Sequence, residues 1–157
     1  MEKTIEMGEK TIKLKSSAAT NVLYKRVFRE DILLKLTEYS KNLKEMQALQ
    51  AKANALREET DKPKEQVLAE MNELLNSDVF VKANEFQSDT LPKLAFVMYL
   101  EANEPTEKLF TKLNEEQYLF WLMTINQDEL LAVTGQVMEI WQAGARTHSN
   151  LKNVNGR

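Results

Sequence analysis

The chain has 157 residues, of which 43% are hydrophobic, so it is long enough to build one domain with an ordinary core. Its formal net charge of −3 gives no attraction to a polyphosphate, so we expect no nucleic-acid partner. There is no cysteine, no apolar leader at the N-terminus and no run approaching the roughly 18 apolar residues of a membrane helix, which predicts a cytoplasmic protein without a membrane partner.

Residues 1–15 are the one stretch with strand character. Ile5 and Met7 alternate with polar neighbours, Gly8 supplies turn chemistry, and Ile12 and Leu14 alternate again. This pattern predicts a short β-hairpin with one apolar face. Because an isolated hairpin is marginal in water, that face is expected to pack on the helical body or to pair with a partner's edge.

The rest of the chain is poor in helix breakers, with 4 Gly and 3 Pro in total, which predicts a mainly α fold. Residues 28–76 are interpreted as a projecting arm made of an antiparallel helical pair, with a tight turn around Pro63. The first helix has an apolar stripe with spacings of three and four, thin in large side chains toward its end. Such a stripe needs a neighbour, so we expect a homo-oligomer. The stripe consists of Ile32, Leu36, Tyr39, Leu43, Met46, Leu49, Ala53 and Leu56.

Residues 89–143 form an aromatic-rich helical body in this interpretation. A helix with Pro92 in its first turn contains LPKLAFVMYLEA, which is apolar on nearly every side and therefore central. A further helix contains YLFWLMTI, and Asp128 is expected to cap a last helix that ends before Gly144. The fold expected is thus one helical domain over residues 1–143, followed by a disordered tail over 144–157.

Catalytic chemistry has little support in the sequence. The only histidine, His148, lies in the predicted tail, and no glycine-rich phosphate loop or Cys/His cluster is present. Neighbouring carboxylates such as Glu115 and Glu116 are typical of the first turn of a helix, where they interact with the helix dipole. We therefore expect a protein that is not an enzyme and has no cofactor and no metal.

The abundance of soft and aromatic side chains points instead to protein binding. Seven methionines and a run of aromatics exceed the needs of a thin helical pair, although most such residues at helical spacing belong to a core. The run from Tyr118 to Leu122 covers both sides of a helix, so part of it must meet a second element or a partner. The partner-binding surface is hypothesised to consist of exposed side chains at Phe110, Tyr118, Trp121, Met138 and Trp141.

Three segments in this order resemble the tail assembly chaperones of long-tailed phages, especially those infecting Gram-positive bacteria. The first is TIEMGEKTIKLKSSAATNVLYKRVFREDILLKL, with a hairpin, a Ser/Ala/Thr segment and a Tyr-Lys pair before an acidic-apolar helix. The second, LAFVMYLEAN, is similar to the family's central helix, and the third, VMEIWQ, is similar to its last helix. Residues 44–84 match no pattern of that family.

The resemblance implies a chaperone that binds and solubilises the tape measure protein during tail morphogenesis in the host cytoplasm, and that is absent from the mature virion. Several copies would coat one long apolar client, with its helices held in grooves by repeated weak contacts. The tail tube protein is a second candidate partner. A structural tail or connector protein retained in the virion is the main alternative, and a helical regulator that binds nucleic acid is a further one.

Overall fold

The computed structural model describes the chain except for residues 59–60, 110–114 and 155–157, and it describes side chains as far as residue 144. The predicted fold class is confirmed, because the chain is mainly α-helical with an antiparallel β-hairpin at its N-terminus.

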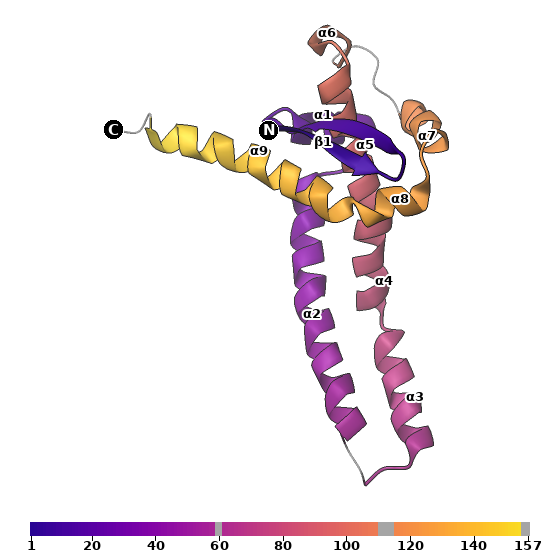
Figure 1. Ribbon diagram of the computed structural model, residues 1–157. Coiled ribbons are helices and arrows are strands. Elements are labelled where there is room, and N and C mark those ends of the chain that lie inside the picture. The colour runs from indigo at the N-terminus through magenta and orange to yellow at the C-terminus, as the bar shows by residue number, and fades with distance from the viewer. Residues whose placement is uncertain (59–60, 110–114, 155–157) are drawn as a thin grey trace. The chain divides into compact units, whose positions relative to one another are not determined.

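Two compact units make up the chain (Figure 1). The arm unit comprises residues 34–86, and the body unit comprises residues 1–33 together with 87–157. The arm predicted from the sequence, 28–76, began earlier and ended earlier than this unit. The body unit is therefore built from two segments of the chain that lie far apart in sequence.

The β-hairpin consists of β1 (Glu2–Met7) and β2 (Lys10–Lys15), which pair antiparallel with Ile5 opposite Ile12. Gly8 has a φ of 61° in the connecting turn, a conformation that favours glycine. The alternating apolar side chains share one buried face, and that face packs on helices of the body unit. The hairpin is thus covered by its own chain.

The central helix of the body is α5 (Leu91–Asn103), and its apolar side chains are buried on almost all sides. The β-hairpin, α1 (Thr20–Phe28) and α9 (Thr134–Val154) all pack against it. Two short helices, α6 (Thr106–Leu109) and α7 (Glu115–Met123), also contact α5. A helix surrounded in this way needs no polar face, which explains its continuous apolar sequence.

The last helix predicted from the sequence is two helices. Asn126, rather than Asp128, caps α8 (Gln127–Ala132), because its side-chain oxygen accepts the backbone N–H of Asp128 at 3.0 Å. The helix ends at Ala132, Val133 is its C-cap residue, and α9 begins at Thr134. Asp128 occupies the first turn of α8, where its charge still favours the helix dipole.

Gly144 does not end α9, contrary to the prediction. The helix continues to Val154, so backbone is helical where the sequence predicted a disordered tail. A Cβ atom at position 144 would overlap the side chain and the carbonyl oxygen of Ser16. Glycine is therefore required here by a close approach of two segments, and inside a helix it costs only about 1 kcal/mol relative to alanine.

The arm unit contains α2 (Ile32–Glu58, from Leu34 onward), α3 (Lys64–Leu75) and α4 (Asp78–Glu85). A five-residue π-helix, Phe86–Thr90, follows. The sequence predicted the first two helices but neither α4 nor the π-helix. Few large side chains of the arm are fully buried, and the clearest are Met71 and Phe86, whose ring stacks on Tyr39 with centroids 4.2 Å apart.

Candidate functional site

The polar segment between β2 and α1 holds the N-terminal part of the body to α9. The hydroxyl of Ser16 donates a hydrogen bond to the carbonyl oxygen of Trp141 at 3.2 Å. The indole Nε1 of Trp141 in turn donates to the side-chain oxygen of Asn21 at 2.8 Å. Trp141 is thus fixed at both its backbone and its side chain.

The same segment also holds α5. The hydroxyls of Ser17 and Thr20 both donate to the carboxylate of Glu101, Thr20 at 2.5 Å. Glu101 and Thr20 are buried, and each carboxylate oxygen has one of these donors. The Ser/Ala/Thr segment noted in the sequence therefore acts as a structural clamp, since its hydroxyls satisfy buried polar groups of the body.

An aromatic cluster fixes one side of α7 in the body. Tyr118 packs edge-on against Phe28 with ring centroids 5.2 Å apart, and it lies 5.5 Å from Phe96. Trp121 lies 5.5 Å from the same Phe96 ring and 5.8 Å from Tyr99. Offset and edge-on contacts of this kind stabilise by about 0.5–1.5 kcal/mol each beyond the area they bury. α7 is therefore anchored through Tyr118 and Trp121.

Burial also raises the pKa of two tyrosines of the body unit. Burial raises the pKa of Tyr24 well above the usual tyrosine value. The Glu30 carboxylate, which accepts a hydrogen bond from the Tyr24 hydroxyl at 3.1 Å, raises it further. Burial raises the pKa of Tyr118 as well, with a smaller contribution from the negative charge of Asp89. Both phenols are therefore neutral hydrogen-bonding groups at any physiological pH.

The opposite side of α7 is an exposed apolar surface. The fractional exposure is 56% for Leu119, 63% for Phe120 and 82% for Met123. Their spacings of one, three and four residues place them on one side of a helix, so they form a continuous patch. We call these three residues the α7 face. Large apolar side chains gathered in this way are typical of surfaces that bind a partner.

The structure does not expose the aromatic residues proposed from the sequence. Tyr118, Trp121 and Trp141 are all buried in the single chain, so their predicted exposure is wrong. Met138 is half-buried on α9. Phe110 lies outside the described residues. On α7 the exposed apolar side chains lie opposite Tyr118 and Trp121, the two residues of this helix that the sequence proposed.

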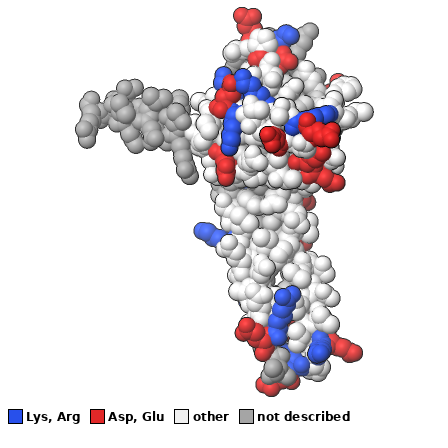
Figure 2. All heavy atoms as spheres, viewed as in Figure 1, with Lys and Arg blue, Asp and Glu red and all other residues white. Residues whose placement is uncertain are grey.

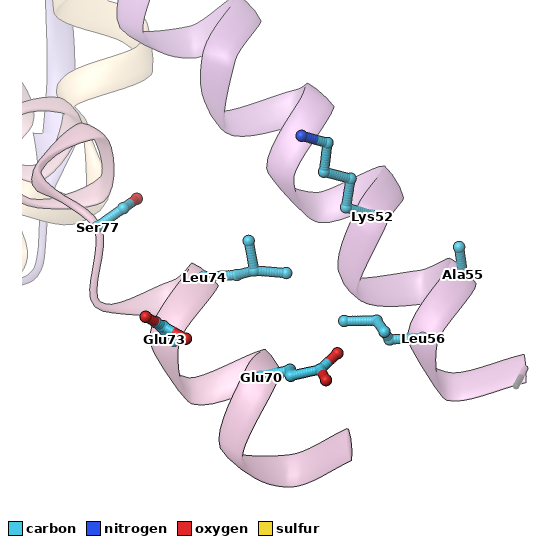
Figure 3. A pocket seen from close by; sticks show the side chains of 7 residues that line it. All are labelled: Lys52, Ala55, Leu56, Glu70, Glu73, Leu74 and Ser77. Atoms are coloured by element: carbon cyan, nitrogen blue, oxygen red, sulfur yellow. The ribbon is translucent and has the colours of Figure 1, made fainter. Parts of the chain in front are cut away.

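A second candidate surface is a cleft of about 590 Å³ between α2 and α3 in the arm unit. Leu56 from α2 and Leu74 from α3 point toward one another across it (Figure 3). Glu70, on the rim, is bonded to Lys62 at 3.4 Å. The buried hydroxyl of Ser77 has no hydrogen-bond partner within the described part of the chain. The lining combines the apolar side chains of Ala55, Leu56 and Leu74 with the polar side chains of Lys52, Glu70, Glu73 and Ser77.

Within the residues that the structure describes, no three His, Cys, Asp or Glu side chains are grouped so that they could bind a metal ion. Over the same residues, none of the helices has the length and apolar character to cross a membrane. No protein-family model, curated protein or solved structure matches the chain.

Proposed function

We propose that the protein is a phage tail assembly chaperone, which binds the apolar helices of the tape measure protein through the α7 face and keeps that protein soluble during tail morphogenesis. The observation that carries the proposal is the pairing of an anchored and an exposed side on one helix. Tyr118 and Trp121 fix α7 in the body, while Leu119, Phe120 and Met123 remain open to a partner.

The chemistry of the α7 face suits a long and variable client. Phenylalanine contributes a large rigid contact area, and the unbranched thioether of methionine adapts to neighbours of different shape. A helix with apolar residues at spacings of three and four can lie against such a patch without forming specific polar contacts. Many weak sites of this kind along one client would add by avidity when several chaperones bind it.

The second support is the resemblance of the segments 4–36, 94–103 and 137–142 to tail assembly chaperones. Two of these segments meet in the structure, because Ser17 and Thr20 of the first bond Glu101 of the second. The third meets the first through the hydrogen bonds from Ser16 to Trp141 and from Trp141 to Asn21. In this proposal the protein acts in the host cytoplasm, is not an enzyme and leaves before the virion is complete.

The test is co-expression with the tape measure protein encoded in the same genome. A Phe120→Ser, Met123→Ser variant should lose the soluble complex, because truncating an apolar anchor at the centre of an interface costs about 2 kcal/mol. Two such losses, about 4 kcal/mol together, weaken binding by roughly 700-fold. The matched control is Val22→Ser, which removes a similarly exposed apolar side chain from α1, and it should leave the complex intact.

A tape measure protein that stays equally soluble with the variant and with the wild-type chain would contradict the role of the α7 face. If the client is soluble without the chain at all, the chaperone function itself is wrong. Mass spectrometry of purified virions separates the main alternative, since a connector or tail component is found in the particle and a chaperone is not.

A further inference from the structure

The arm unit carries an uncharged side that is separate from its cleft. On α2 the stripe Leu43, Gln47, Gln50 and Asn54 has spacings of four, three and four, and on α3 the stripe Leu68, Asn72 and Leu75 has spacings of four and three. Each stripe lies about a quarter turn from the seam between the two helices. Because the two helices are antiparallel and right-handed, a quarter turn from the seam in the same sense brings both stripes to the same side of the pair. The two stripes therefore form one surface, here called the amide–leucine face.

This surface is exposed and lacks charge along its middle. Leu68 and Leu75 are 58% and 46% exposed, and Gln47, Gln50 and Asn54 are exposed as well. Figure 2 shows a side of the arm on which Lys, Arg, Asp and Glu are scarce along the middle and gather near the end where α2 and α3 are joined. A surface core depleted of charge is the composition that distinguishes interface cores from the rest of a protein's surface.

The seam of the arm is incompletely buried, which gives the unit a reason to bind something. Met46, on the seam, and Leu43, on the neighbouring stripe, are each only half-buried in the single chain. A pair of helices shields its apolar stripes from two directions, whereas a four-helix arrangement encloses them. Covering the amide–leucine face would therefore complete the core of the arm.

We propose that the occupant of the amide–leucine face is the same face of a second copy of this chain, forming an antiparallel four-helix arrangement about a two-fold axis. In an antiparallel pair, residues at equal distances from the connecting turn lie side by side. Gln50 is thus level with Asn72, Gln47 with Leu75, and Asn54 with Leu68. An axis perpendicular to the helices at Gln50 then sets the Leu68 of one copy against the Leu75 of the other. It also sets Gln47 against Asn54 and Gln50 against itself.

The match is self-complementary in chemistry, as a two-fold interface requires. Leucines meet leucines along the α3 helices, and amides meet amides along the α2 helices, where each amide group both donates and accepts hydrogen bonds. No pair of like charges is brought together in the middle of the interface. The same face would be a poorer fit for a strongly apolar client, since half of it consists of amides.

The area sets the expected strength of this dimer. The part of α2 centred on Gln50, residues 42–58, is about 25 Å long, and two helices side by side are about 20 Å wide. The face therefore covers about 500 Å² on each copy and buries about 1,000 Å² in total, at the lower limit of specific interfaces. We expect a weak dimer that dissociates on dilution.

Sedimentation equilibrium of the full chain without client measures this directly. The wild-type mass should rise from monomer to dimer with concentration, and a Leu68→Glu, Leu75→Glu variant should remain monomeric at every concentration, because four buried carboxylates would face each other. Ala55→Glu is the matched control, since it adds a charge at an exposed position that lines the cleft instead, and it should dimerise like the wild type. Circular dichroism checks that all three chains are equally helical.

Cross-linking tests the position of the axis. The chain has no cysteine, so a Gln50→Cys variant has a single thiol, which should form a disulfide-linked dimer on mild oxidation. Lys52→Cys, on the cleft side, should not. A wild-type chain that is monomeric throughout, or a Leu68→Glu, Leu75→Glu variant that dimerises normally, overturns the proposal. If that variant is monomeric like the wild type but fails to bind the tape measure protein, the face belongs to the client.

Discussion

The body unit and the arm unit are both made of helices with apolar stripes, yet they bury those stripes to different depths. In the body, Leu94, Phe96 and Met98 of α5 are almost completely buried. In the arm, Leu43 and Met46 of α2 are only half-buried. The difference comes from the arrangement of neighbours, because α5 is contacted by a β-hairpin and several helices, whereas the other helices of the arm, α3 and α4, follow one another along one side of α2 (Figure 1). An apolar stripe thus becomes a core only when it is enclosed from several directions.

The difference between the units should have its largest effect on the free energy of unfolding of variants in which an apolar side chain is truncated. Phe96→Ala should lower the free energy of unfolding by about 3–5 kcal/mol, because it leaves a cavity in the aromatic cluster. Leu74→Ala in the arm should lower it by about 1 kcal/mol, since its side chain is half-buried and lines an open cleft. Urea titration followed by tryptophan fluorescence reports the body, which contains both tryptophans, and circular dichroism reports both units. Equal losses for the two variants would remove the distinction between the units.

Removing a hydroxyl from each unit sharpens the comparison. Thr20→Ala should cost about 2–3 kcal/mol, because it takes one of two donors from the buried Glu101 carboxylate. Ser77→Ala in the arm should be neutral or slightly stabilising, since that buried hydroxyl has no partner among the described residues and does not cap α4. Denaturant midpoints of the two variants against the wild type give the answer. A costly Ser77→Ala would mean that the arm hydroxyl has a partner in solution.

The smallest expected effect appears at high pH and concerns the body. Since the folded-state pKa of Tyr24 and of Tyr118 is raised, their contribution to stability is complete below the pKa of an unfolded tyrosine and is lost as the pH rises above it. Each of them should lower the free energy of unfolding by at most about 1.4 kcal/mol per pH unit in that range. A Tyr118→Phe variant should therefore lose stability more slowly than the wild type in alkaline urea titrations. An identical slope would show that Tyr118 ionises freely in the folded chain.

Local patterns were sufficient to predict the β-hairpin, the long α2 helix and the central place of α5. Each depends on alternation or periodicity within one segment, as the match of Ile5 with Ile12 across a glycine turn illustrates. The helix α4 was missed although Val79, Ala83 and Phe86 have helical spacing, because the arm was expected to end at residue 76. Ser77, at the N-cap position of α4, makes no side-chain cap hydrogen bond.

The sequence identified the apolar run of α7 but not the side of it that is exposed. The run from Tyr118 to Met123 shows that one helix has apolar residues on both sides, but it does not show which side the fold covers. That choice is made by Phe28 and Phe96, which come from distant segments and contact Tyr118. Gly144 is a similar case, since the segment that requires a glycine there contains Ser16, far away in sequence. Contacts between segments far apart in sequence cannot be predicted from the local pattern of apolar residues.

The bond between Ser16 and Trp141 spans 125 residues, and this separation has a consequence for how the protein is made. At roughly 5–20 residues per second, a ribosome needs about 6–25 s to synthesise the chain between the two partners. During that interval the arm helices, whose contacts are local, have time to form. The β-hairpin cannot yet make its contacts with α9, which has not been synthesised. A nascent chain therefore carries a finished arm and an unfinished body. The core of the body is therefore complete only after the C-terminal helix has left the ribosome.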